Sequence, residues 1–165
     1  MFRYNRWANE QLFSACRTLA EAQLTARPPG LSGSVAELLT HIVGAQQTFI
    51  LRTGGRQHEG ELSRRSDWPG IEALTELARA TSDDLVAIAS ALDDEAAYSD
   101  VDLPYQGSVY RFPRSFFLVH ALEHGVDHRT EVKVGLMQLG IDTPDLDGWR
   151  WAADAGYGQQ VTSRG

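Results

Sequence analysis

Apolar side chains recur every three or four residues along four long stretches of the chain, which is the spacing of a helix with one buried face. The predicted helices cover residues 2–24, 34–52, 70–92 and 113–139. Ser34 and Glu37 match a capping box at the start of the second helix, and Gly140 stands where the fourth would end. Four such helices in 165 residues predict an all-α fold, a four-helix bundle.

The segments between and after these helices carry polar and turn-forming residues. Residues 54–66 are polar and contain glycine, so we expect a surface loop with His58 as a solvated side chain. Residues 98–112 resemble two short extended pieces around a turn, an irregular hairpin or loop before the last long helix. Residues 147–157 are predicted to form a short C-terminal helix that covers the bundle. Beyond Gly158 the composition is typical of a fraying end.

The composition indicates one compact domain over residues 1–165. A hydrophobic content of 42% is enough for a substantial core in a chain of this length. The formal net charge of −7 argues against binding to a nucleic-acid backbone and favours small-molecule or protein partners. The single cysteine, Cys16, cannot form an internal disulfide and lies among apolar positions, where a free thiol behaves as a small hydrophobe.

The chain also lacks the signals that would direct it to a membrane. No apolar run approaches the roughly 20 residues that a membrane-spanning helix needs. The N-terminal residues do not show the charged, apolar and small segments of a signal peptide. We therefore expect no membrane partner and a cytoplasmic location.

Three histidines mark the fourth predicted helix: His120, His124 and His128, at intervals of four residues. They lie on one stripe of that helix, so His124 and His128 can share one small target. A neutral imidazole nitrogen binds divalent metals, but two such ligands do not complete a zinc or nickel site. A third ligand must come from elsewhere, and the candidate is His41, because the second and fourth helices of a bundle can face each other.

Each of these histidines also has a simpler interpretation. His41 lies beside Leu38 and Ile42 on an apolar face, where a core histidine bonded to a carbonyl is the simpler expectation for a single residue. His120 lies eight residues, ~12 Å along the helix axis, from His128, which is too far for both to bind one ion. We expect His120 to lie in the wall of the pocket or to contact one of the metal-ligating side chains. An ordinary position at the boundary of the core is the alternative.

The residue that follows His124 excludes one familiar metal motif. Metalloproteases of the HExxH type place their general base, a glutamate, directly after the first histidine, whereas residues 124–128 read HGVDH. Three neutral imidazoles would leave an ion its full charge and an open position, at which a water or a thiol loses its proton near neutral pH. Tyr4 and Trp7, about one turn apart, are expected to pack in the core or to frame the end of such a pocket.

Four segments together give a more specific signal than any single motif. They are Tyr4–Glu10 (YNRWANE), Leu38–Ile42 (LLTHI), His120–Arg129 (HALEHGVDHR) and Met137–Gly140 (MQLG). In this order and at these separations they resemble the DinB family of damage-inducible proteins, which is unrelated to the DNA polymerase of the same name. The resemblance implies a four-helix bundle, often a homodimer, with a zinc or nickel ion bound by three histidines that correspond to His41, His124 and His128.

The resemblance also implies a chemistry. Some members of the family are thiol-dependent enzymes, including transferases that use a low-molecular-weight thiol and a mycothiol-dependent isomerase. By analogy we expect a metal-dependent enzyme that activates a thiol or a water for attack on a small electrophile. The alternatives are a stress-response bundle that binds metal or a small ligand without turnover, and a helical dimer with no metal. Zinc and nickel both suit imidazole ligands, so both stay open.

Two departures from the family pattern fall close to the histidines. Glu123 stands where the family commonly has asparagine, and Arg129-Thr130-Glu131 replaces a common Arg-Gly-Gln. The histidines themselves are unaffected. A carboxylate close to the ligands would act on the site through its charge, raising the pKa of a bound water.

Overall fold

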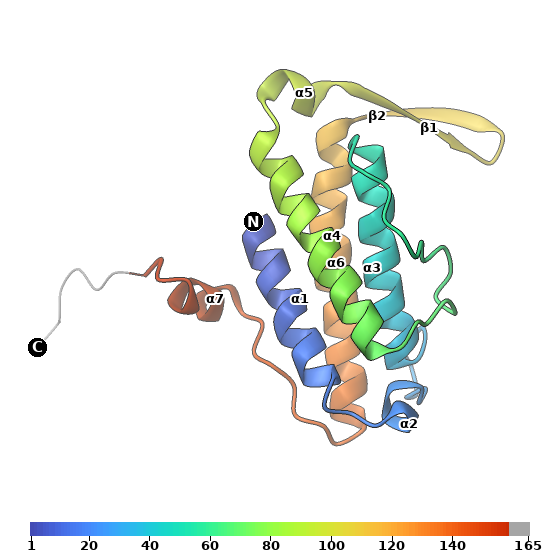
Figure 1. The fold of residues 1–165 in the computed structure, drawn as a ribbon, viewed down its shortest axis with the longest axis vertical. Coiled ribbons are helices and arrows are strands. Elements are labelled where there is room, and N and C mark those ends of the chain that lie inside the picture. The colour runs from blue at the N-terminus through green and yellow to red at the C-terminus, as the bar shows by residue number, and fades with distance from the viewer. Residues whose placement is uncertain (159–165) are drawn as a thin grey trace, which may run out of the picture.

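Four long helices form the body of the molecule in a computed structural model that describes residues 1–158 (Figure 1). They are α1 (Phe2–Cys16), α3 (Val35–Arg52), α4 (Ile71–Ala91) and α6 (Arg114–Gln138). Helix α3 packs against both α4 and α6, and α1 packs mainly against α4 and to a lesser extent against α6. The four helices therefore close into a bundle, which confirms the predicted all-α fold.

The first helix is shorter than the sequence predicts. Instead of continuing to residue 24, α1 ends at Cys16, and a separate short helix, α2, covers Glu21–Leu24. The Thr18 hydroxyl donates to the carbonyl of Ala15 (2.8 Å), and the backbone N–H of Ala20 donates to the Gln23 side chain (2.9 Å). These local side-chain bonds compete with the helical ladder and end it, although the apolar spacing continues.

A hairpin precedes the last long helix, as predicted. Strands β1 (Asp100–Tyr105) and β2 (Ser108–Pro113) pair antiparallel, with Val101 opposite Phe112. The turn residues Gln106 and Gly107 both have positive φ angles, of 48° and 79°, which the tight two-residue hairpin turn requires. The short helix α5 (Asp94–Tyr98), which the sequence does not predict, leads into the hairpin.

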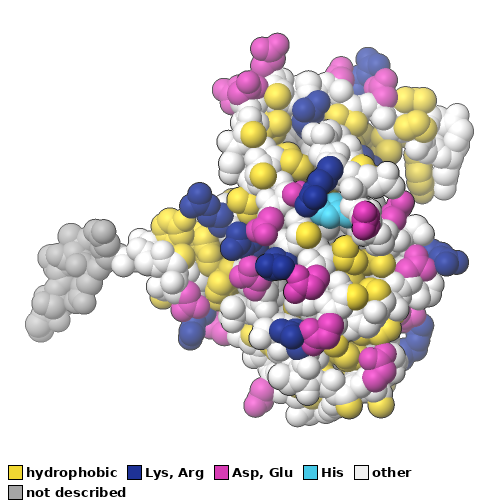
Figure 2. Space-filling view, in the orientation of Figure 1, with side chains coloured by type: hydrophobic (Ala, Val, Ile, Leu, Met, Phe, Trp, Pro, Cys, Tyr) yellow, Lys and Arg dark blue, Asp and Glu magenta, His cyan; other side chains and the backbone are white. Residues whose placement is uncertain are grey.

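The C-terminal helix α7 (Gly148–Asp154) lies to one side of the bundle and contacts α1 (Figure 1). The Tyr4 hydroxyl donates to the carbonyl of Leu146 (2.8 Å), and the rings of Tyr4 and Trp151 lie 5.8 Å apart. Trp149 remains 83% exposed, and Figure 2 shows apolar side chains gathered on this part of the surface. The helix therefore covers less of the bundle than expected, and the fraying predicted beyond Gly158 lies outside the described residues.

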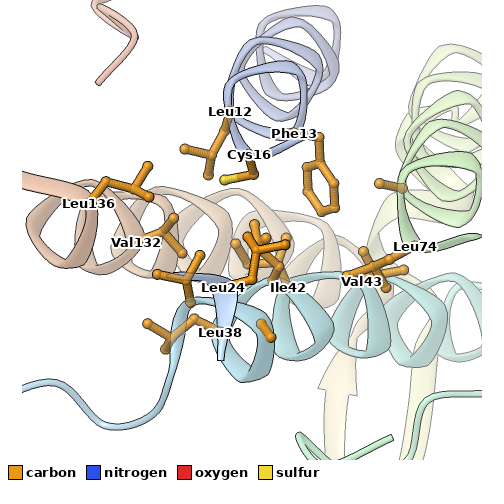
Figure 3. Packing of buried hydrophobic residues seen from close by; sticks show 14 of the residues in the cluster. Leu12, Phe13, Cys16, Leu24, Leu38, Ile42, Val43, Leu74, Val132 and Leu136 are labelled. Carbon is orange, nitrogen blue, oxygen red and sulfur yellow. The ribbon is translucent and has the colours of Figure 1, made fainter. Parts of the chain in front are cut away.

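The core consists of two apolar clusters separated by a polar layer. One cluster joins Leu12, Phe13 and Cys16 of α1 to α3, α4 and the C-terminal half of α6 (Figure 3). The other is built around Phe49 of α3 and Phe117 of α6. Between the clusters lie buried polar side chains from all four long helices, which are Asn5, Asn9, Gln46, Thr81, Ser82 and Arg129. His124 and His128 lie at the level of this layer, between Ala121 of one cluster and Val132 of the other.

The connection between α3 and α4 is a loop, as predicted, but His58 is not solvated. Its side chain is only 5% exposed, and Nε2 lies 2.9 Å from Oδ2 of Asp84 on α4, although not aligned for a hydrogen bond. Arg56 donates to the same carboxylate (2.7 Å). The polar composition of the loop did not predict that His58 is buried. Its burial is favoured by the nearby carboxylate of Asp84, which lies on another element.

None of the helices within residues 1–158 combines the length and the apolar character that crossing a membrane would need. On the face drawn in Figure 2, Lys and Arg side chains are interspersed with Asp and Glu.

Candidate metal centre

Three of the four candidate histidines come together in the middle of the bundle. His124 and His128 project from successive turns of α6, and His41 faces them from α3. One ligand nitrogen from each of the three lies within 4.8 Å of the other two. The ring centroids are 4.6 Å apart for His41 with His124, 4.6 Å for His41 with His128, and 4.4 Å for His124 with His128. The structure thus brings the predicted triad to one point.

The spacing of these nitrogens suits a metal ion. Nε2 of His41 and Nε2 of His124 face each other at 3.0 Å. Around a tetrahedral zinc ion with bonds of about 2.05 Å, ligand nitrogens lie roughly 3.3 Å apart. The fold thus places three imidazoles from two packed helices close enough together to hold a divalent ion between them.

The surroundings of two of the histidines keep their nitrogens unprotonated. Burial, together with the charges of Arg65 and His128, lowers the pKa of His41 to about 4. Burial likewise lowers the pKa of His124 to about 3, with added repulsion from His128 and His41. Both rings are neutral at pH 7, so their lone pairs are available, which is the form that ligates a metal.

A carboxylate orients the third histidine. Nδ1 of His128 lies 3.1 Å from Oε2 of Glu131, one turn further along α6, which leaves Nε2 free to face the other rings. The other oxygen, Oε1, accepts from the backbone N–H of Ser32 at 2.6 Å. Burial would raise the pKa of Glu131, but the hydrogen bonds from Ser32 and His128 outweigh it and lower that pKa. A carboxylate bonded to a ligand histidine fixes its ring and strengthens its basicity.

Glu131 belongs to one of the two departures from the family pattern. It follows His128 by three residues on the same helix, and this spacing could have predicted the contact from the sequence. Glu123, the other departure, is exposed on α6.

The other two predicted pocket residues lie at different places. The ring of His120 is 4.9 Å from that of Phe49 and 6.1 Å from that of His124, so it stands beside the triad and outside the ligand set. Trp7 is half-buried on α1, with its ring 6.1 Å from that of Tyr4. It lines a separate surface hollow together with Arg3, Arg6 and Val86, so the structure does not bring Trp7 to the histidines.

A hollow of about 370 Å³ opens beside the triad. It is lined by α3 from His41 to Arg52, by His120 and His124 of α6, and by residues 61–65 of the loop. Pockets of this volume accommodate small organic molecules. The arrangement can therefore hold an ion on three imidazoles with space for a small ligand next to it.

The family model of the DinB family matches residues 1–160. The chain belongs to the DinB family. Two crystal structures show the same fold. A DinB-like protein from Bacillus cereus superposes with a TM-score of 0.66 at 22% identity, over 87% of this chain and 91% of that one. A DinB-like protein from Bacillus subtilis gives a TM-score of 0.63 at 21% identity, over 88% of this chain and 94% of that one. No curated protein sequence matches the chain significantly.

Proposed function

We propose that this DinB-family protein is a metal-dependent enzyme that activates a low-molecular-weight thiol, or a water, for attack on a small electrophile. The observation that carries the proposal is the convergence of His41, His124 and His128, whose ligand nitrogens lie within 4.8 Å of one another. The ion would be zinc or nickel, both of which suit imidazole. When bound, it supplies a positive charge that lowers the pKa of a thiol or water beside it.

The residues of this chain supply the positioning. Glu131 fixes the ring of His128, and burial keeps His41 and His124 neutral, so each of those two rings has a nitrogen lone pair free for an ion. Phe49 packs edge-on against His124, with ring centroids 5.9 Å apart, and limits the access of water from that side. The hollow leaves one open approach, along α3, for the reacting molecules.

The reaction in this proposal is a simple displacement. The thiol gives its proton to solvent, its sulfur forms a bond to the electrophilic atom, and the leaving group departs with the electron pair of the broken bond. The protein's own thiol does not take part, because Cys16 is fully buried and burial raises its pKa to about 12.

Loss of free thiol tests the catalytic part of the proposal. Wild-type protein loaded with zinc or nickel is incubated with low-molecular-weight thiols and a panel of electrophiles, in parallel with the His124→Ala variant. We expect wild type to consume thiol with at least one electrophile and His124→Ala to remain at the background rate. Thiol consumption at the background rate across the panel would contradict the thiol-transfer form of the proposal and favour the alternative, a stress-response bundle that binds metal without turnover.

A further inference from the structure

The hollow beside the triad is elongated along α3. Its lining residues on that helix extend from His41 to Arg52. At 1.5 Å per residue this stretch is roughly 16 Å long. A small molecule that extends along the hollow can therefore reach from His41 at one end of this stretch to Arg52 at the other.

The loop wall of the hollow is held in a defined position. A Cβ at Gly44 would lie only 2.3 Å from the carbonyl oxygen of Leu62, so the loop touches α3 where the helix has no side chain. Gln47 holds the loop at this contact and two residues before it. Its amide donates to the carbonyl of Gly60 (3.2 Å), and its oxygen accepts from the N–H of Leu62 (2.9 Å). The side chains that follow Leu62 are thereby placed along the hollow.

Two of the three arginines that line the hollow have no carboxylate partner among residues 1–158. Arg64 is neutralised by Asp67 at 3.0 Å. Arg65 donates instead to the hydroxyl and the carbonyl of Ser32, at 2.6 Å and 3.4 Å. Arg52 lies over the ring of Phe117 at 5.4 Å, and burial lowers its pKa. A guanidinium that is partly removed from water and not paired with an anion is an unsatisfied charge.

The two arginines without a carboxylate partner, Arg65 and Arg52, lie at different ends of the hollow. Arg65 lies near the triad, because it donates to Ser32, whose backbone N–H donates to Glu131, the carboxylate that contacts His128. Arg52 lies at the opposite end of the α3 wall. The lining contains a single carboxylate, that of Glu61, which accepts from Gln57 at 3.4 Å.

From this geometry we propose that the hollow binds an acidic small molecule, held by Arg65 next to the histidines and by Arg52 at the far end. The guanidinium fork donates paired hydrogen bonds to carboxylate or phosphate oxygens, so both acid groups share the required chemistry. The inference deepens the proposed function, since it names an organic acid as the substrate class of the same site. Binding of the acid by these two arginines does not require a metal ion, because neither arginine belongs to the histidine triad that would hold the ion.

Binding of matched acidic and neutral probes tests the inference. Suberate, a dicarboxylate long enough to place one acid group at each arginine, is titrated against its neutral diamide, and hexane-1,6-diyl bisphosphate against hexane-1,6-diol, by calorimetry with metal-free wild type. The same titrations use Arg52→Gln, Arg65→Gln and, as a control, Arg79→Gln, whose arginine pairs with Glu76 on the exposed face of α4. We expect at least one acid to bind, its neutral partner to bind at least tenfold more weakly, and each hollow variant to lose about tenfold in affinity.

The comparison of the two acids identifies the acid group that the hollow prefers. Equal affinities for acid and neutral probe, no detectable binding of either acid, or unchanged affinity in both Arg52→Gln and Arg65→Gln would overturn the inference. Thermal unfolding of every variant, expected to match that of Arg79→Gln, shows that a lost affinity is not a lost fold. Because these titrations are made without metal, their outcome is independent of whether the triad holds an ion or turns over a thiol.

Discussion

At the scale of single residues, the triad was predictable because both its residue types and its spacing are visible in the sequence. Two histidines four apart on a helix must share a face, and the family resemblance singled out His41 as their partner. Arg65 could not be assigned in the same way. Its place beside the histidines depends on the loop contact at Gly44, which no periodicity records.

Glu131 should matter to metal affinity through its contact with His128. Glu131→Gln removes the charged acceptor at Nδ1, so we expect the metal dissociation constant to rise roughly 10- to 100-fold, measured by competition with a chromogenic chelator. Glu123→Gln is the matched control, since it removes an exposed carboxylate from the same helix. An equal effect of the two substitutions would show that only net charge is at work.

Cys16 should be unreactive in the folded protein. Its pKa is raised to about 12 by burial, so the folded state keeps the thiol proton at a pH where the unfolded chain releases it. Between the ordinary value of 9.0 and about 12, unfolding therefore releases a proton, and the free energy of unfolding falls as the pH rises. We expect no labelling by a disulfide reagent at pH 8 until denaturant is added. Rapid labelling of the native protein would contradict this burial.

At the scale of the elements, hydrophobic periodicity located the four long helices but not every place where they end. The apolar spacing runs through Leu19 to Leu24, whereas side-chain hydrogen bonds of Thr18 and Gln23 end α1 and begin α2. Such bonds depend on local geometry and leave the apolar pattern intact. The buried place of His58 escaped prediction for a related reason, because its partner Asp84 is distant in sequence.

The contact between α3 and the loop should depend on the absence of a side chain at Gly44. Gly44→Ala places a Cβ 2.3 Å from the carbonyl oxygen of Leu62, so the loop must move. We expect a loss of about 1–3 kcal/mol in the free energy of unfolding, measured with urea. Gly148→Ala is the control, since its added methyl meets no atom within 4 Å. A stability equal to wild type in Gly44→Ala would contradict the tight approach.

At the scale of the whole molecule, α6 presents a second apolar face to the surface. Phe116, Val119, Val126 and Met137 are 39%, 54%, 46% and 56% exposed, respectively, on the helix that also carries two of the three triad histidines. An exposed apolar stripe of this kind is typical of a contact surface. Together with the family resemblance, it leads us to propose that the protein is a homodimer through α6.

Light scattering after size-exclusion chromatography tests this proposal. We expect twice the chain mass of 18.2 kDa for wild type and the monomer mass for Val119→Glu. Val109→Glu, on the hairpin, alters a residue that is 66% exposed and should leave the dimer intact. A monomeric wild type would overturn the proposal.

The metal content of untagged protein bears on the proposed function, because the proposed activation of a thiol or a water requires the triad to hold an ion. We would measure it by inductively coupled plasma mass spectrometry in wild type, His41→Ala, His124→Ala and His120→Ala, each purified without a nickel column. Near-stoichiometric zinc or nickel in wild type and His120→Ala, lost in the other two, is the predicted result. Metal absent from wild type even after incubation with zinc or nickel, or retained in His41→Ala and His124→Ala, would contradict it.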